Sequence, residues 1–95
     1  MLVDSTLDKI IDHYGRDHQI EKAVEELGEL IVAIAKKRGA EMLLQHDPHY
    51  RRDIIEEIAD VKIVVAQLEL IFFCRDEVEQ MVDYKLRRTL EKMEG

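Results

Sequence analysis

Residues 20–39 read IEKAVEELGELIVAIAKKRG, and this stretch decides the fold. Its apolar residues recur three or four positions apart, which is the repeat of one face of an α-helix. They are Ile20, Ala23, Val24, Leu27, Leu30, Ile31 and Ile34. We predict a helix that begins near Arg16 or Asp17 and ends at residues 36–39, where three bases precede a glycine. Bases suit the negative end of a helix, and glycine often follows its last turn.

The sequence before this stretch predicts one short helix. Its apolar residues Leu7, Ile10 and Ile11 again follow the helical repeat. We expect the helix to run from about residue 5 to residue 14, with Asp4 or Ser5 as its cap and with a glycine at position 15 to end it. It is short enough to serve as a docking element for the longer helices.

The sequence after this stretch predicts two more helices. Residues 40–46 can form an extra turn or a loop, and Asp47 followed by Pro48 then predicts a third helix, which should reach about Cys74. Asp76 with Glu79 resembles a capping arrangement for a fourth helix that ends near residue 93. The predicted fold class is therefore all-α, a helical bundle built on an antiparallel hairpin of the second and third helices.

The composition limits the classes of function. A chain of 95 residues favours one domain, here residues 1–95. Its 21 acids outnumber its 14 bases, and the bases are scattered, so binding to duplex nucleic acid or to a membrane surface is not expected. A lone cysteine and the lack of a signal-peptide pattern favour the cytoplasm.

The third predicted helix suggests self-association. Between residues 61 and 73 it is apolar on nearly every face, more than packing against two neighbours in a small monomer requires. The stretch is interrupted by Lys62, Gln67 and Glu69 and is too short to span a membrane. We expect a homo-oligomer, either a dimer or a tetramer.

Two pairs of acids stand out on the second and third helices. Glu26 with Glu29, and Glu57 with Asp60, are three residues apart, so each pair shares one helix face. If the hairpin is antiparallel, both pairs lie about 14 Å from its loop end and can converge. A cation would relieve their repulsion, and oxygen ligands favour Mg²⁺, with Mn²⁺ as the second choice.

The acidic pairs also have a simpler interpretation. Other acids in this chain share the same spacing, so an ordinary solvated helix face explains the spacing equally well. The equal distance of Glu29 and Glu57 from the predicted loop is what distinguishes their two pairs from the others. No histidine follows a glutamate by three residues, so the di-iron pattern of helical bundles is missing.

The acidic motifs resemble a known enzyme family. Glu25-Glu26-Leu27-Gly28-Glu29, followed after 27 residues by Glu57-Ile58-Ala59-Asp60, is similar to the signature of the MazG-like all-α nucleoside triphosphate pyrophosphohydrolases. The resemblance implies an oligomeric bundle that uses Mg²⁺ to hydrolyse a nucleoside triphosphate between its α and β phosphates. The products would be a nucleoside monophosphate and pyrophosphate.

The resemblance also implies roles for individual residues. It makes metal ligands of the four paired acids, which are Glu26, Glu29, Glu57 and Asp60. Glu25 becomes the candidate for orienting or deprotonating the attacking water. Lys85 and Arg88 resemble the bases that the family places on its last helix to bind phosphate, although they are equally explained as surface charges. Gln19, ahead of the first motif, is a candidate for contacting the base of the nucleotide. Alternatively, it is an ordinary solvated residue in the first turn of its helix.

Two other functions remain open at this stage. Phosphoribosyl-ATP pyrophosphohydrolase of histidine synthesis resembles this chain in length and in its acidic helical motifs. A non-catalytic helical oligomer that acts as a binding module would use the acids only as soluble surface. The sequence assigns neither the base nor the sugar of the nucleotide.

Overall fold

The structure, a computed structural model, describes residues 1–44 and 49–95. These residues form four helices, which are α1 (Asp4–Tyr14), α2 (Arg16–Met42), α3 (His49–Ile71) and α4 (Arg75–Glu94). No strand occurs among the described residues, so the all-α prediction is confirmed. In this part of the chain, no helix combines the length and the apolar character that crossing a membrane requires.

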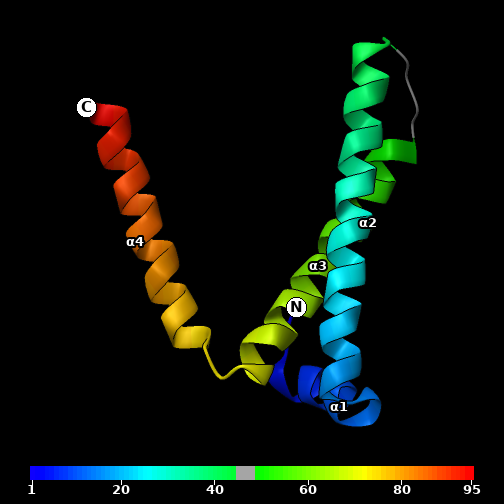
Figure 1. The fold of residues 1–95 in the computed structure, drawn as a ribbon, viewed down its shortest axis with the longest axis vertical. Helices are drawn as coiled ribbons and strands as arrows, with labels where there is room; N and C mark the ends of the chain where they lie inside the picture. Colours follow the sequence, from blue (N-terminus) through cyan, green and yellow to red (C-terminus); the bar gives the residue numbers. More distant parts are fainter. Residues whose placement is uncertain (45–48) are drawn as a thin grey trace.

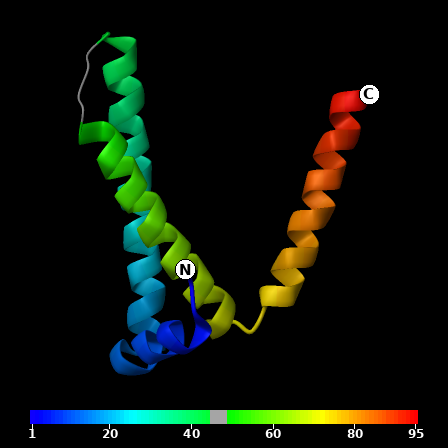
Figure 2. The ribbon, with the colours of Figure 1, turned by 180° about the vertical axis from the view of Figure 1, so that it is seen from behind.

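Helices α2 and α3 lie side by side and run in opposite directions, and α1 crosses their lower end (Figures 1 and 2). The register between them is visible at Gln19 of α2, whose side chain is hydrogen-bonded to Gln67 of α3. The small core contains Leu7 of α1, Ala23 of α2 and Val64 of α3, all less than 5% exposed. Small side chains such as Ala23 let the two long helices approach closely, which brings polar side chains of both helices into contact.

The predicted end of the second helix at residues 36–39 is wrong, because α2 continues to Met42. Glu41 explains the extra turn, since its carboxylate lies 3.6 Å from Lys37 Nζ and 2.9 Å from Arg38 Nη1. Such ion pairs between successive turns favour continuation of a helix. Gly39 is therefore an interior helical residue. The extra turn projects beyond the first residues of α3 (Figure 1), so it does not alter which residues of the two helices face each other.

The predicted caps of the first and last helices are also wrong. Helix α1 begins at Asp4 itself, and Val3 occupies the cap position without a side-chain hydrogen bond. Helix α4 begins at Arg75, so Asp76 lies within its first turn instead of capping it. Gly15 does end α1 as expected, and its φ of 95° is a conformation that favours glycine. The predicted start at Asp47 and Pro48 lies outside the described residues.

Helix α3 ends earlier than predicted, at Ile71. Phe73 has a φ of 52°, and this left-handed backbone turns the chain away before Cys74. Two contacts hold this turn against the first residues of α1 and α2. Arg75 donates hydrogen bonds of 2.8 Å from both terminal nitrogens to the Asp4 carboxylate, and the Arg16 guanidinium lies 5.4 Å from the centre of the Phe72 ring.

Helix α4 diverges from the other three helices and contains no buried residue (Figures 1 and 2). Its apolar side chains, among them Met81, Val82, Leu86 and Leu90, are about half exposed or more. The radius of gyration is 16.7 Å, whereas a compact domain of this length has one of about 12 Å. The single chain therefore leaves a large apolar helix face without a partner.

Candidate metal centre

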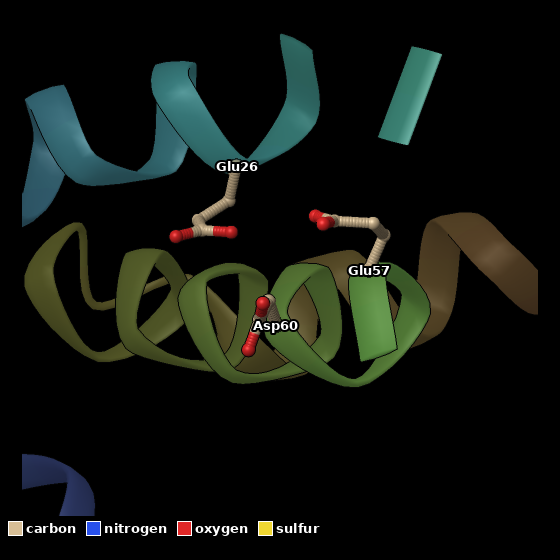
Figure 3. A group of neighbouring side chains, drawn as sticks. All are labelled: Glu26, Glu57 and Asp60. Atoms are coloured by element: carbon tan, nitrogen blue, oxygen red, sulfur yellow. The ribbon is translucent and has the colours of Figure 1, made fainter. Parts of the chain in front are cut away.

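Three carboxylates converge where α2 and α3 face each other (Figure 3). Glu26 projects from α2, and Glu57 and Asp60 project from successive turns of α3. One oxygen of each carboxylate lies within 4.8 Å of the corresponding oxygens of the other two. This spacing is short enough for a single cation to contact all three. We call these three residues the acidic cluster.

Glu26 is the buried member of the acidic cluster. It is only 6% exposed, and its Oε1 forms an ion pair of 3.1 Å with Lys22 Nζ one turn earlier on α2. Its other oxygen, Oε2, is buried and has no hydrogen-bond partner in the described residues, and the same is true of Glu57 Oε2. A buried carboxylate oxygen without a partner is costly. Two carboxylates of one cluster that each carry such an oxygen are the arrangement expected where a cation completes the bonding.

The charges of the cluster perturb the acids around it. Burial raises the pKa of Asp60 above its usual range, and the neighbouring Glu26 carboxylate adds to this effect. The pKa of Glu29 is also raised, first by the charge of Glu26 and further by desolvation and by Glu57. Lys22 opposes this repulsion, and its hydrogen bond to Glu26 raises its own pKa. The site thus carries more negative charge than its one lysine balances.

Glu29 and Glu25 lie beside the acidic cluster and not within it. Both line a large cavity of about 510 Å³ between α2 and α3. Glu57 of the acidic cluster lines the same cavity, so the cavity adjoins the cluster. Glu29 is close enough for the charges of Glu26 and Glu57 to act on its carboxyl. The Glu25 side chain is 58% exposed and lies 3.8 Å from Lys22 Nζ. The structure therefore brings together three of the four predicted ligands and places the fourth next to them.

The predicted phosphate-binding bases of α4 lie elsewhere in the single chain. Lys85 and Arg88 belong to the diverging helix α4, away from the acidic cluster (Figure 1). A different base, Lys36, lines the large cavity together with Tyr50 and Glu57. The sequence analysis used Lys36 only to mark a helix end. Its position seven residues, or almost two turns, after Glu29 could have placed it on nearly the same face as Glu29.

Gln19 is buried, so the alternative of a solvated residue is wrong. It is 5% exposed, and its Nε2 donates a 2.9 Å hydrogen bond to Oε1 of Gln67, which is 1% exposed. The two amides border a small cavity of about 120 Å³ that also contacts Glu26 and Asp60 of the acidic cluster. Sequence reasoning missed Gln67, although a lone amide in the middle of an apolar helical stretch was a visible signal.

The arrangement could hold a metal ion. All the available ligand atoms are carboxylate oxygens, the type that hard cations such as Mg²⁺ and Mn²⁺ prefer, and two of the three carboxylates have a buried oxygen without a partner among the described residues. The large cavity on one side of the cluster falls within the usual size range of ligand sites. Comparisons with known protein families, with curated proteins and with solved structures found no match to this chain.

Proposed function

We propose that the chain is a Mg²⁺-dependent nucleoside triphosphate pyrophosphohydrolase of the MazG-like type. The observation that carries the proposal is that Glu26 and Glu57, which cluster with Asp60, each have a buried carboxylate oxygen without a hydrogen-bond partner among the described residues. An ordinary solvated acidic face would expose these oxygens to water, so their burial favours the metal-binding interpretation over the surface interpretation. The order of the acidic motifs along the chain supports the same conclusion.

The acidic cluster has a defined role in this proposal. Glu26, Glu57 and Asp60 would hold the ion, and Glu29, on the neighbouring turn of α2 and close enough to feel the charges of Glu26 and Glu57, would supply a further ligand. A bound Mg²⁺ supplies charge neutralisation for the polyphosphate and orients the groups of an in-line displacement. Raised pKa values at Asp60 and Glu29 fit ligands whose negative charge is stabilised only when the cation is present.

Glu25 is proposed to take the proton of the attacking water. Its carboxylate is exposed and lines the large cavity, so it can reach a water that approaches a phosphate held at the acidic cluster. Lys36 borders the same cavity and would pair with the departing pyrophosphate. No covalent nucleophile is required, because the water attacks the α-phosphate and the bond to the β-phosphate oxygen breaks.

We also propose that the protein functions as a homo-oligomer. Helix α4 has no buried residue, and the radius of gyration of 16.7 Å is too large for a compact monomer. Packing of α4 against the long helices of a second copy would bury its apolar face and bring Lys85 and Arg88 toward that copy's acidic cluster. Light scattering at micromolar concentration should give a dimer or tetramer, and a monomer would contradict this part of the proposal.

The function is tested by pyrophosphate release from a panel of ribo- and deoxyribonucleoside triphosphates. Release should require Mg²⁺ and should fall at least about tenfold in Asp60→Asn, since loss of even a partner that only orients a metal ligand typically costs about 10–100-fold. Asp12→Asn makes the same chemical change at an exposed position of α1 and serves as the control. Unchanged release by a folded Asp60→Asn variant would refute the role of the cluster, and absence of release from every triphosphate would refute the function.

A further inference from the structure

We propose that Lys22 is the built-in counter-ion of the acidic cluster, a tethered cation that stabilises the metal-free fold and weakens the binding of a divalent ion. The inference rests on the metal site of the proposed function and not on its reaction. Lys22 belongs to α2 and lies one turn before Glu26. Its role follows from where its ammonium group lies.

The ammonium group of Lys22 contacts the edge of the acidic cluster. Its Nζ lies 3.1 Å from Oε1 of Glu26 and 3.8 Å from Oε1 of Glu25. Lys22 also lines the small cavity that contacts both Glu26 and Asp60. The Lys22 side chain is 41% exposed, whereas that of Glu26 is 8% exposed. The lysine therefore brings a positive charge from the surface of α2 to a buried carboxylate.

The charge of Lys22 acts on acids of both long helices. On α2, the hydrogen bond to Glu26 raises the pKa of Lys22, and the charges of Glu25 and Glu29 add to this effect. On α3, Lys22 opposes the rise in the pKa of Asp60 that burial and Glu26 cause. One lysine therefore partly neutralises four carboxylates. This neutralisation reduces the repulsion between α2 and α3 when no metal ion is bound.

Lys22 and a divalent ion would compete for the same negative charge. Lys22 pairs with Oε1 of Glu26, whereas Oε2 of Glu26 and Oε2 of Glu57 are buried and have no partner among the described residues. A cation held by these carboxylates would be repelled by the ammonium group as well as attracted by the acids. Such repulsion is strong where water is largely excluded. The acidic cluster should therefore bind a divalent ion more weakly with Lys22 than without it.

A different role for Lys22 makes the opposite prediction. A group that holds one oxygen of a ligand can orient the other oxygen toward a metal, and loss of such a partner weakens metal binding. The structure favours the counter-ion role for two reasons. Glu26 is only 6% exposed, so packing already restricts its side chain. Lys22 is a long, flexible and partly exposed side chain, which fixes the orientation of a carboxylate poorly.

The test compares Lys22→Met with the matched control Lys37→Met. Lys37 also lies on α2, its side chain is 43% exposed, and its Nζ is 3.6 Å from Glu41 one turn later. The control therefore removes a similar ion pair outside the acidic cluster. Without metal, the melting temperature should fall further in Lys22→Met than in the control, because the cluster loses its cation. The dissociation constant for Mn²⁺, measured by electron paramagnetic resonance of the free ion at low ionic strength, should fall about tenfold in Lys22→Met, the lower end of the usual effect of a group that contacts a metal ligand. It should not change in the control.

Two further substitutions separate the charge of Lys22 from its packing. Lys22→Arg keeps the positive charge, so it should bind Mn²⁺ as weakly as the unmodified protein. Lys22→Gln keeps a polar side chain without the charge, so it should bind Mn²⁺ as tightly as Lys22→Met. Lys22→Gln also replaces Lys22→Met in the test should the latter fail to fold. The combination of lower stability and tighter metal binding is specific to the counter-ion role, because a structural defect would weaken both.

Several results would overturn the inference. They are unchanged or weaker Mn²⁺ binding in the uncharged Lys22 variants, a metal-free melting temperature of these variants no lower than that of the control, and no Mn²⁺ binding by any of the proteins. Weaker binding would identify Lys22 as a positioning residue for Glu26. Pyrophosphate release is measured separately. Release by the unmodified protein with unchanged Mn²⁺ affinity in the Lys22 variants refutes this inference alone. Tighter Mn²⁺ binding in these variants without release from any triphosphate refutes the proposed function alone.

Discussion

Replacing Glu26 by glutamine should stabilise the metal-free protein and abolish its response to Mg²⁺. Glu26→Gln keeps the shape of the side chain and removes its charge. The buried Oε2 then becomes part of a neutral amide beside Glu57 and Asp60, so the repulsion within the acidic cluster falls. The substitution also removes the ion pair between Glu26 and Lys22. This loss is small, because the Lys22 side chain is 41% exposed and water can solvate its charge.

The size of the effect follows from the geometry of the acidic cluster. Two carboxylate charges no more than 4.8 Å apart repel each other by at least about 0.9 kcal/mol at the dielectric constant of water and by at least about 3.5 kcal/mol at an effective value of about 20. Loss of the Lys22 pair offsets part of this relief. With a net gain of about 1 kcal/mol, the melting temperature of a domain this small should rise by about 4–8 °C.

The assay is thermal melting at pH 7 followed by circular dichroism, with and without Mg²⁺ at fixed protein concentration. Mg²⁺ at about a hundred times its dissociation constant stabilises the folded state by about 2.7 kcal/mol. The melting temperature of the unmodified protein should then increase by about 10–20 °C, and that of Glu26→Gln should not change. Glu21→Gln, an exposed substitution on the same helix, is the matched control.

Two results would refute the reasoning behind this prediction. A lower melting temperature of metal-free Glu26→Gln would mean that the Lys22 ion pair outweighs the repulsion from Glu57 and Asp60. A full response to Mg²⁺ in the variant would mean that Glu26 is not a ligand. The control must retain both the melting temperature and the metal response of the unmodified protein.

Further predictions concern pH, the start of α4 and the large cavity. Because the pKa values of Asp60 and Glu29 are raised, the folded metal-free protein binds more protons than the unfolded chain in the pH range just above the usual pKa values of these acids. Its free energy of unfolding should therefore fall as pH rises through this range. Mg²⁺ should remove this fall. The hydrogen bonds from Arg75 lower the pKa of Asp4, so this ion pair stabilises the folded protein at neutral pH and the stabilisation is lost on acidification. In Asp4→Asn, the free energy of unfolding should therefore depend less on pH in the acid range. An unchanged pH dependence would contradict this prediction. Lys36→Met should raise KM for the triphosphate at least about threefold with little change in melting temperature, as expected for loss of a solvent-accessible charge contact; an unchanged KM would exclude contact with the substrate.

Helix ends were predicted less well than helix positions. The apolar repeat of residues 20–34 identified α2 correctly because burial of one face dominates helix formation. Its end was misplaced because Glu41 pairs with Lys37 and Arg38, which keeps Gly39 helical. The first and last helices likewise lack the side-chain caps that their acids predicted. Asp4 instead pairs with Arg75, 71 residues away in the sequence.

The sequence by itself determined the helical class and the residues from which the acidic cluster is drawn. Both follow from local spacing, since side chains three or four residues apart must share a helix face. Only the tertiary structure decided that Glu26 and not Glu29 meets Glu57 and Asp60, and that Gln67 is buried with a donor that has no partner among the described residues. Burial and contact across two helices depend on their separation and rotation, which the pattern of either helix alone does not fix.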